Sequence, residues 1–116
     1  KDMGYTIEVG QEVNDLVKDP FLRKNILLII KEAINNSAKY SQASLVEIEV
    51  RSASAHLNIT IKDNGVGFDS TSAGTGNGLG NMKKRCEDIR GAFVLQSTPG
   101  QGTRIEVNIP MANIRH

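Results

Sequence analysis

The residues with the clearest chemical potential share one face of a predicted helix. Glu32, Asn36 and Lys39 follow one another at intervals of four and three residues, and Tyr40 comes next. Such intervals place side chains on the same side of a helix. A carboxylate, an amide and a cation on an otherwise apolar helix suit a cavity that holds a charged ligand. On the helix pattern alone, Asn36 and its neighbour Asn35 would more simply be solvated positions.

A second candidate is Asp63, at the end of a predicted strand. Residues 57–63 alternate between apolar and polar side chains, with the apolar ones directed inward. By the same parity Asp63 also points inward, where a carboxylate is costly unless groups donate hydrogen bonds to it. We therefore expect Asp63 to have a partner in a pocket. The competing interpretation is that the Asp-Asn-Gly sequence of residues 63–65 is only a turn signal.

A third candidate is the glycine-rich stretch 74–80, which has glycine at every second position. A Walker loop would continue with Lys and Ser or Thr, but Asn81 and Met82 follow Gly80. The dinucleotide fingerprint would follow a strand directly, whereas a polar loop precedes this stretch. What remains is either a flexible linker or a glycine loop that leads into a helix N-terminus, where backbone amides favour an anion.

The elements that must position these residues follow from the hydrophobic periodicity. Alternating patterns predict strands, and the strands at 45–51 and 57–63 should form a hairpin. The strands are expected at 5–9 (half-buried), 45–51, 57–63, 93–96 and 103–109.

Two helices are expected. The first begins at Asp19-Pro20 and runs to about Ser41, with Ser37 on its apolar stripe. The second covers Met82–Ile89, with Asn81 as its cap and Gly91 as a left-handed terminator. Residues 11–18 look like a weak helical turn or a loop. This order predicts an α+β two-layer sandwich, with helices on one face of a mixed sheet of about five strands.

Composition narrows the classes of function. The 116 residues suit one domain, 1–116, and a formal charge of +1 with scattered aromatic residues argues against nucleic-acid binding. Cys86 is the only cysteine, which fits a reducing compartment, and it should be an inert helix residue. The two histidines, His56 and His116, lie far apart and give a metal site little support. No apolar run is long enough to cross a bilayer, so we expect no membrane contact by this domain.

Four stretches, read together, resemble the ATP-binding domain of sensor histidine kinases, part of the GHKL group of ATPases and kinases. They are residues 32–40, 63–68, 76–82 and 100–103, with the sequences EAINNSAKY, DNGVGF, GNGLGNM and GQGT. Each stretch alone is unspecific, but they occur in the family's order and cover most of the chain. Residues 78–85, together with 39–41 upstream, look most like the branch that pairs with nitrate-type response regulators.

The resemblance implies ATP and Mg²⁺ as ligands, and it implies roles on the first helix. Asn36 matches the asparagine that ligates Mg²⁺ in the family. Lys39 would reach phosphate, and Tyr40 would sit beside the nucleotide. Glu32 would help to hold the metal or its waters, or would activate water as in the ATPases of the group.

The resemblance also implies roles for the later stretches. Asp63 matches the aspartate that accepts the hydrogen bond of the adenine amino group, and Thr103 matches a threonine near the adenine. Gly65 and Gly67 would let the backbone lie against the base. The residues that would form the lid hinge and surround the phosphates are Gly76, Gly78, Leu79 and Gly80.

The chain departs from a complete histidine kinase in one respect. Nothing in it resembles the phosphoacceptor histidine motif, because His56 lies in a predicted strand and His116 is terminal. We therefore expect a catalytic piece of a longer sensor kinase, monomeric alone and cytoplasmic, whether or not its parent is anchored in a membrane. It would act on a separate dimerisation domain, with a response regulator downstream. The alternatives are an anti-sigma-factor serine kinase of the same group and a nucleotide-binding regulatory domain without transfer activity.

Overall fold

The computed structural model describes residues 4–38, 42–53, 55–67 and 79–111. In chain order this part of the protein contains β1 (Gly4–Val9), α1 (Gln11–Leu16), α2 (Pro20–Asn36), β2 (Leu45–Ala53), β3 (His56–Asp63), α3 (Leu79–Asp88), β4 (Ala92–Ser97) and β5 (Thr103–Pro110). None of the helices within these ranges is long and apolar enough to span a bilayer.

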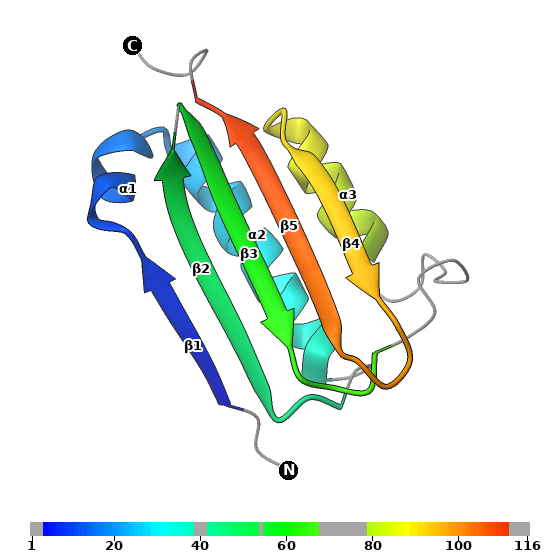
Figure 1. Ribbon diagram of the computed structural model, residues 1–116. Helices are drawn as coiled ribbons and strands as arrows, with labels where there is room; N and C mark the ends of the chain where they lie inside the picture. The colour runs from blue at the N-terminus through cyan, green and yellow to red at the C-terminus, as the bar shows by residue number, and fades with distance from the viewer. Residues whose placement is uncertain (1–3, 39–41, 54, 68–78, 112–116) are drawn as a thin grey trace.

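The strands form a five-stranded sheet in the order β1-β2-β3-β5-β4. β1 runs parallel to β2, and the other neighbouring pairs are antiparallel, including the predicted β2–β3 hairpin. Helices α2 and α3 lie behind the sheet in Figure 1, on one face. This is the α+β sandwich with a mixed sheet that the pattern predicted.

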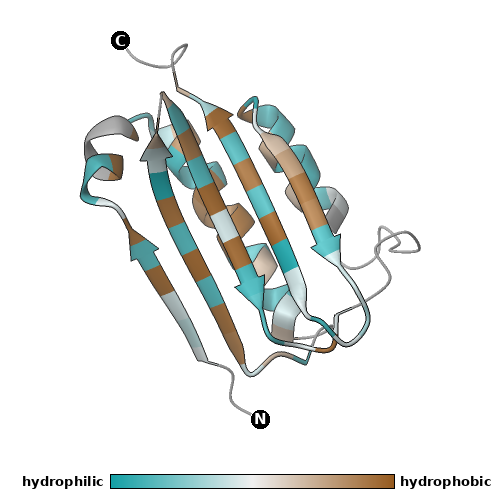
Figure 2. Ribbon diagram, viewed as in Figure 1, coloured by the Kyte–Doolittle hydropathy of each residue, from teal (hydrophilic) through white to brown (hydrophobic). Residues whose placement is uncertain are grey.

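The core lies between that face and the two helices. Figure 2 shows the cause, because apolar and polar residues alternate along each central strand. The strand side chains that this alternation buries are Val46, Ile48 and Val50 of β2, Leu57, Ile59 and Ile61 of β3, and Ile105, Val107 and Ile109 of β5.

Helix α2 begins as predicted, with Pro20 in its first turn and the Asp19 carboxylate accepting a hydrogen bond from the backbone N–H of Phe21 (3.3 Å). The sequence predicted an end at about Ser41, which falls just beyond the described residues. The α-helix stops at Asn36 and is followed by a π-type turn at 37–38. The carbonyl of Ser37 accepts a hydrogen bond from the N–H of Ala43 (3.2 Å), which draws the chain toward β2. Residues 39–41 lie outside the described ranges.

Residues 11–16 form a regular helix, α1, where the sequence indicated only a weak turn or loop. Its buried side chain Val13, with Val17 just beyond its end, joins the core. The Glu12 carboxylate accepts a hydrogen bond from the backbone N–H of Ser52 (3.3 Å). Hydrogen bonds from the N–H groups of Glu12 itself and of Ser52 hold the pKa of the Glu12 carboxyl below its usual value. These tertiary contacts are what a local pattern does not reveal.

The boundaries of α3 correct two predictions. The helix starts at Leu79, so Asn81 lies inside it and is not its cap. Its C-terminus is a Schellman motif, in which the N–H of Gly91 bonds to the carbonyl of Cys86 (2.8 Å) and that of Arg90 to Glu87 (2.9 Å). The left-handed residue is Arg90, with φ of 62°, and not Gly91.

Strand β1 is where burial was predicted wrongly. The alternating pattern predicted a half-buried strand, yet all six residues of the strand are exposed. The register places Tyr5, Ile7 and Val9 on the same face as the core residues of β2. They are 57%, 46% and 47% exposed because α2 and α3 cover the strands further along the sheet.

Candidate functional site

Asp63 is the centre of the candidate site. It ends β3 directly opposite Thr103, the first residue of β5. Its Oδ1 accepts hydrogen bonds from the backbone N–H groups of Gly65 (3.0 Å) and Thr103 (3.1 Å), and its Oδ2 accepts one from the Ser37 hydroxyl (2.8 Å). The inward parity of Asp63 is thus confirmed. Its half-buried carboxylate is held by donors from three separate segments of the chain.

Two glycines allow the loops around Asp63 to pack against each other. Gly67 has φ of 69°, and a Cβ there would lie 2.2 Å from the carbonyl oxygen of Thr98. Gly102 has φ of 79°, and its Cβ would lie 2.3 Å from the carbonyl oxygen of Asp63. Any other residue at either position would force these turns apart. In this structure the two glycines serve loop packing, whatever further contact they make with a ligand.

The other side of the site is the end of α2. Glu32 and Asn36 are both half-buried, whereas Asn35 is exposed. The Asn36 Nδ2 is buried and has no hydrogen-bond partner among the described residues. A buried amide without a partner is costly, so this side chain is suited to a ligand that completes its contacts.

The structure brings together part of the predicted set. Asp63, Gly65, Gly67 and Thr103 surround one strand end, and Ser37 joins them to the helix end that carries Asn36. Leu79 and Gly80 lie in the first turn of α3. The predicted residues Lys39, Tyr40, Gly76 and Gly78 lie outside the described ranges.

Ser37 is the residue that sequence reasoning missed. It was assigned to the apolar stripe of the first helix, and its burial agrees with that assignment. A hydroxyl on a buried stripe needs a hydrogen-bond partner, and an inward carboxylate needs a donor. Matching these two requirements could have paired Ser37 with Asp63.

The hydroxyl of Thr103 is also engaged. It lies 2.8 Å from the Ser97 hydroxyl, and both side chains are buried. Thr103 therefore reaches Asp63 through its backbone N–H, not through its side chain. This backbone hydrogen bond links the first residue of β5 directly to the Asp63 carboxylate.

Two of the cavities in the described part of the chain bear on where a ligand could bind. One of about 290 Å³ borders Asp63 and Thr103 and is also lined by Lys62 and Arg104, which alternate onto the sheet face away from the helices. Ser37 and Asn36 do not line it, so it adjoins the site described above and does not coincide with it.

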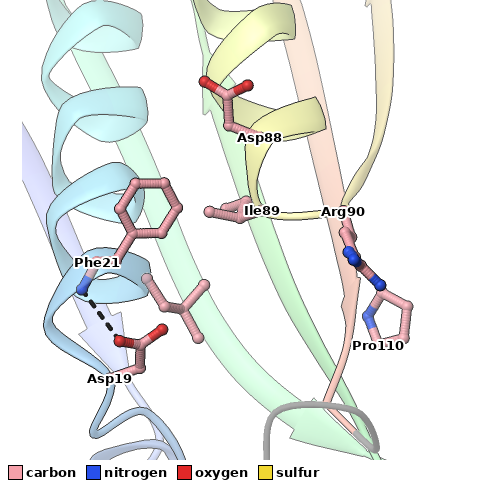
Figure 3. A pocket seen from close by; sticks show the side chains of 7 residues that line it. Asp19, Phe21, Asp88, Ile89, Arg90 and Pro110 are labelled. Atoms are coloured by element: carbon pink, nitrogen blue, oxygen red, sulfur yellow. Dashed lines mark hydrogen bonds between the residues drawn. The ribbon is translucent and has the colours of Figure 1, made fainter.

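The other cavity, of about 260 Å³, lies at the opposite end of the sheet, where Pro110 pairs with His56. Figure 3 shows its charged side chains, Asp19, Asp88 and Arg90, around apolar walls that include Phe21 and Ile89. It has none of the residues that the sequence singled out as a ligand site.

Cys86 takes no part in this chemistry. It is a fully buried residue of α3, and burial, with a smaller effect of Glu87, raises the pKa of its thiol to about 11. Since the thiolate is the reactive form, the expectation of an inert cysteine agrees with its surroundings.

Comparison with known proteins identifies the family. Residues 22–113 match the model of the histidine kinase-, DNA gyrase B- and HSP90-like ATPases. The chain belongs to this family. The match spans α2 through β5 and so includes every described part of the site.

Curated relatives of this ATPase domain are sensor kinases. It is 36% identical over 84 residues to the signal transduction histidine-protein kinase/phosphatase DegS of Brevibacillus brevis, covering 72% of the chain and 22% of that protein. It is 32% identical over 106 residues to the sensor protein VraS of Staphylococcus aureus, covering 90% of the chain and 30% of that protein. The chain thus spans less than a third of the length of either relative.

Solved structures show the same fold. A blue-light activated histidine kinase of Erythrobacter litoralis superposes with a TM-score of 0.80 at 16% identity, over 97% of this chain and 36% of that one. The ATP-binding domain of PrrB from Mycobacterium tuberculosis superposes with a TM-score of 0.73 at 23% identity, over 96% of this chain and 82% of that one. The domain is of the histidine-kinase ATP-binding catalytic type, which is favoured over the anti-sigma-factor kinase.

Proposed function

We propose that this domain binds ATP with Mg²⁺ and transfers the γ-phosphoryl group to a histidine on a separate dimerisation domain of its parent protein. The observation that carries the proposal is the half-buried Asp63 carboxylate, held by three donors at the strand end where the family's nucleotide site is expected.

Asp63 is proposed to accept the hydrogen bond of the adenine amino group. An ionised carboxylate only accepts hydrogen bonds, so it suits an amino group and repels a carbonyl at the same place. Gly65 and Gly67 are proposed to lie with their backbone against the base, and Thr103 beside it. Hydrogen-bonding sites of this kind discriminate against ligands that lack the matching group.

Asn36 is proposed as a Mg²⁺ ligand through its amide oxygen, with Glu32 holding the ion or its waters. No three His, Cys, Asp or Glu side chains in the described ranges are grouped so as to hold a metal. That agrees with Mg²⁺, which is usually bound by one or two protein oxygens together with waters and substrate phosphates. When bound, the ion would neutralise charge on the phosphates.

The remaining matched residues are proposed for the phosphates and the lid. Lys39 would contact phosphate, and Tyr40 would lie beside the nucleotide. Gly76, Gly78, Leu79 and Gly80 would bring backbone amides to the phosphates at the start of α3, where a helix N-terminus favours negative charge.

In the proposed reaction a histidine nitrogen attacks the γ-phosphorus, the bond from that phosphorus to the departing oxygen breaks, and ADP leaves. The work of this chain is to hold ATP in line with the nucleophile, since phosphoryl transfer depends mainly on positioning and charge neutralisation. The histidine is proposed to come from another domain, since His56, the histidine within the described ranges, pairs its Nδ1 with the Asn108 Oδ1 (2.8 Å) at the other end of the sheet.

We also propose the kind of protein to which this domain belongs and the partner that acts after it. The domain would be a monomeric cytoplasmic piece of a sensor kinase, with a response regulator downstream. Residues 78–85 support the branch that pairs with nitrate-type regulators, although the names of the relatives do not confirm that branch.

The test is Asp63→Asn, with ATP binding measured by calorimetry. The amide keeps the shape of the side chain, and the Ser37 hydroxyl can rotate to match it, but one acceptor becomes a donor that faces the adenine amino group. We expect ATP affinity to fall by at least about tenfold. The matched control is Asp88→Asn at the cavity of Figure 3, which should bind ATP normally. Unchanged ATP affinity in Asp63→Asn would refute the assignment, and so would an equal loss of affinity in Asp88→Asn.

A further inference from the structure

We propose that Ser37 is a positioning residue that sets the adenine selectivity of the site through Asp63. This rests on the proposed nucleotide-binding function and deepens it. Ser37 directly follows Asn36, so one turn of chain would carry both the proposed metal ligand and the group that orients the base acceptor.

Ser37 is itself held in place by the surrounding backbone. Its backbone N–H bonds to the carbonyls of Ala33 and Ile34, and its own carbonyl accepts from Ala43 (3.2 Å). The residue is only 5% exposed. With its backbone bonded on both sides and its side chain buried, its hydroxyl has a defined position relative to β3.

The chemistry of the two groups fixes which one donates in the hydrogen bond between Ser37 and Asp63. The carboxylate of Asp63 is an acceptor, so the Ser37 hydroxyl donates to Oδ2, over 2.8 Å. Hydrogen bonds to a charged group are stronger than those between neutral groups. This contact links the end of α2 to the end of β3, which are 26 residues apart in the chain.

The two carboxylate oxygens of Asp63 have different hydrogen-bond donors. Oδ1 already accepts two backbone N–H groups, from Gly65 and Thr103, as many as it has lone pairs. The Ser37 hydroxyl donates to the other oxygen, Oδ2, so Ser37 helps to set how the carboxylate faces the adenine amino group. Ser37 thus acts on base recognition without needing to touch the base.

The experiment compares two nucleotides on Ser37→Ala by calorimetry. One is ATP, and the other is purine riboside triphosphate, which has hydrogen in place of the adenine amino group. We expect the variant to bind ATP about tenfold more weakly than the wild type, as fits the loss of a charged hydrogen bond. Both proteins should bind the analogue equally, because it makes no contact that Ser37 can influence.

The controls separate positioning from general damage. Ser44→Ala removes a hydroxyl that accepts from the Asn64 Nδ2 (2.9 Å), next to Asp63, and should change neither affinity. Ser37→Thr restores a hydroxyl and should recover at least part of the preference for ATP. Thermal unfolding of each variant shows that the fold is intact.

The outcomes are distinct. Equal weakening of ATP and the analogue by Ser37→Ala would mean a merely structural role and would overturn the inference, as would no weakening at all. A wild-type protein that binds ATP and the analogue equally would instead refute the adenine role of Asp63, and with it the proposed function.

Discussion

At the scale of single residues, the site depends on polar groups whose partners are far away in the sequence. Asp63 receives donors from the end of α2, from its own turn and from β5. Asn36 differs, because its Nδ2 is buried with no partner among the described residues. Asp63 is held in place by the protein itself, whereas the Nδ2 donor of Asn36 has no acceptor among the described residues.

The proposed Mg²⁺ role of the Asn36 amide oxygen predicts separable effects on nucleotide binding and on the gain from Mg²⁺. Asn36→Ala should leave nucleotide affinity without Mg²⁺ nearly unchanged, because the base is held elsewhere. It should lose most of the gain in affinity that Mg²⁺ adds, and also phosphoryl transfer to a supplied dimerisation domain. The measurement is ATP calorimetry with Mg²⁺ and with a chelator.

Asn35→Ala is the matched control, since Asn35 is the exposed neighbour on the same helix. It should behave as the wild type does. An Asn36→Ala protein that kept the full Mg²⁺ effect, or an Asn35→Ala protein that lost it, would remove Asn36 from the metal site.

At the scale of elements, the end of α3 shows why a correct motif can be assigned to the wrong residue. The sequence places Gly91 near the helix end, where glycine commonly takes the left-handed position. In the structure Arg90 takes it, one residue earlier. Gly91 is needed for space, because a Cβ there would lie 2.9 Å from the Cys86 Sγ and 3.1 Å from the Ile109 Cγ1.

Two opposite substitutions follow from this geometry. Arg90→Gly should raise the free energy of unfolding by up to about 1 kcal/mol, since glycine adopts positive φ without strain. Gly91→Ala should lower it by about 1–3 kcal/mol, because the new methyl group overpacks the contact with β5. Denaturant unfolding of both proteins measures the two changes, and an Arg90→Gly protein less stable than the wild type would contradict the left-handed assignment of Arg90.

At the scale of the whole molecule, the core is unevenly covered. Helices α2 and α3 lie over the strands from β2 to β4, while the apolar face of β1 is exposed at the sheet edge. Ile7 and Ile48 are direct neighbours in the β1–β2 register, yet Ile7 is 46% exposed and Ile48 is 2% exposed. The same side chain on the same face of the sheet therefore has two different environments.

This pair gives a matched test of the fold. Ile48→Thr should lower the free energy of unfolding by about 2–4 kcal/mol, because it removes buried apolar volume and buries a hydroxyl. Ile7→Thr should change it by less than about 0.5 kcal/mol. Both changes are measured by denaturant unfolding at two protein concentrations. Equal losses of unfolding free energy in the two variants would contradict the exposed edge at β1. If those losses changed with protein concentration, they would reveal self-association at that edge.

The sequence by itself determined the parts of this protein that depend on local periodicity. Alternation identified the inward faces of β2, β3 and β5, and with them the inward direction of Asp63, because neighbouring strand residues must face opposite sides of a sheet. The spacing of Glu32 and Asn36 along α2 was equally readable, since a helix repeats every 3.6 residues.

Only the tertiary structure decided which residues meet across the chain. It paired Ser37 with Asp63, set Gly67 and Gly102 against carbonyls of neighbouring loops, ended α2 at Asn36 and left the apolar face of β1 exposed. The physical reason is that strand order, helix coverage and loop packing arise from contacts between distant segments. A local pattern states which side of an element is buried, but it does not say what lies against that side.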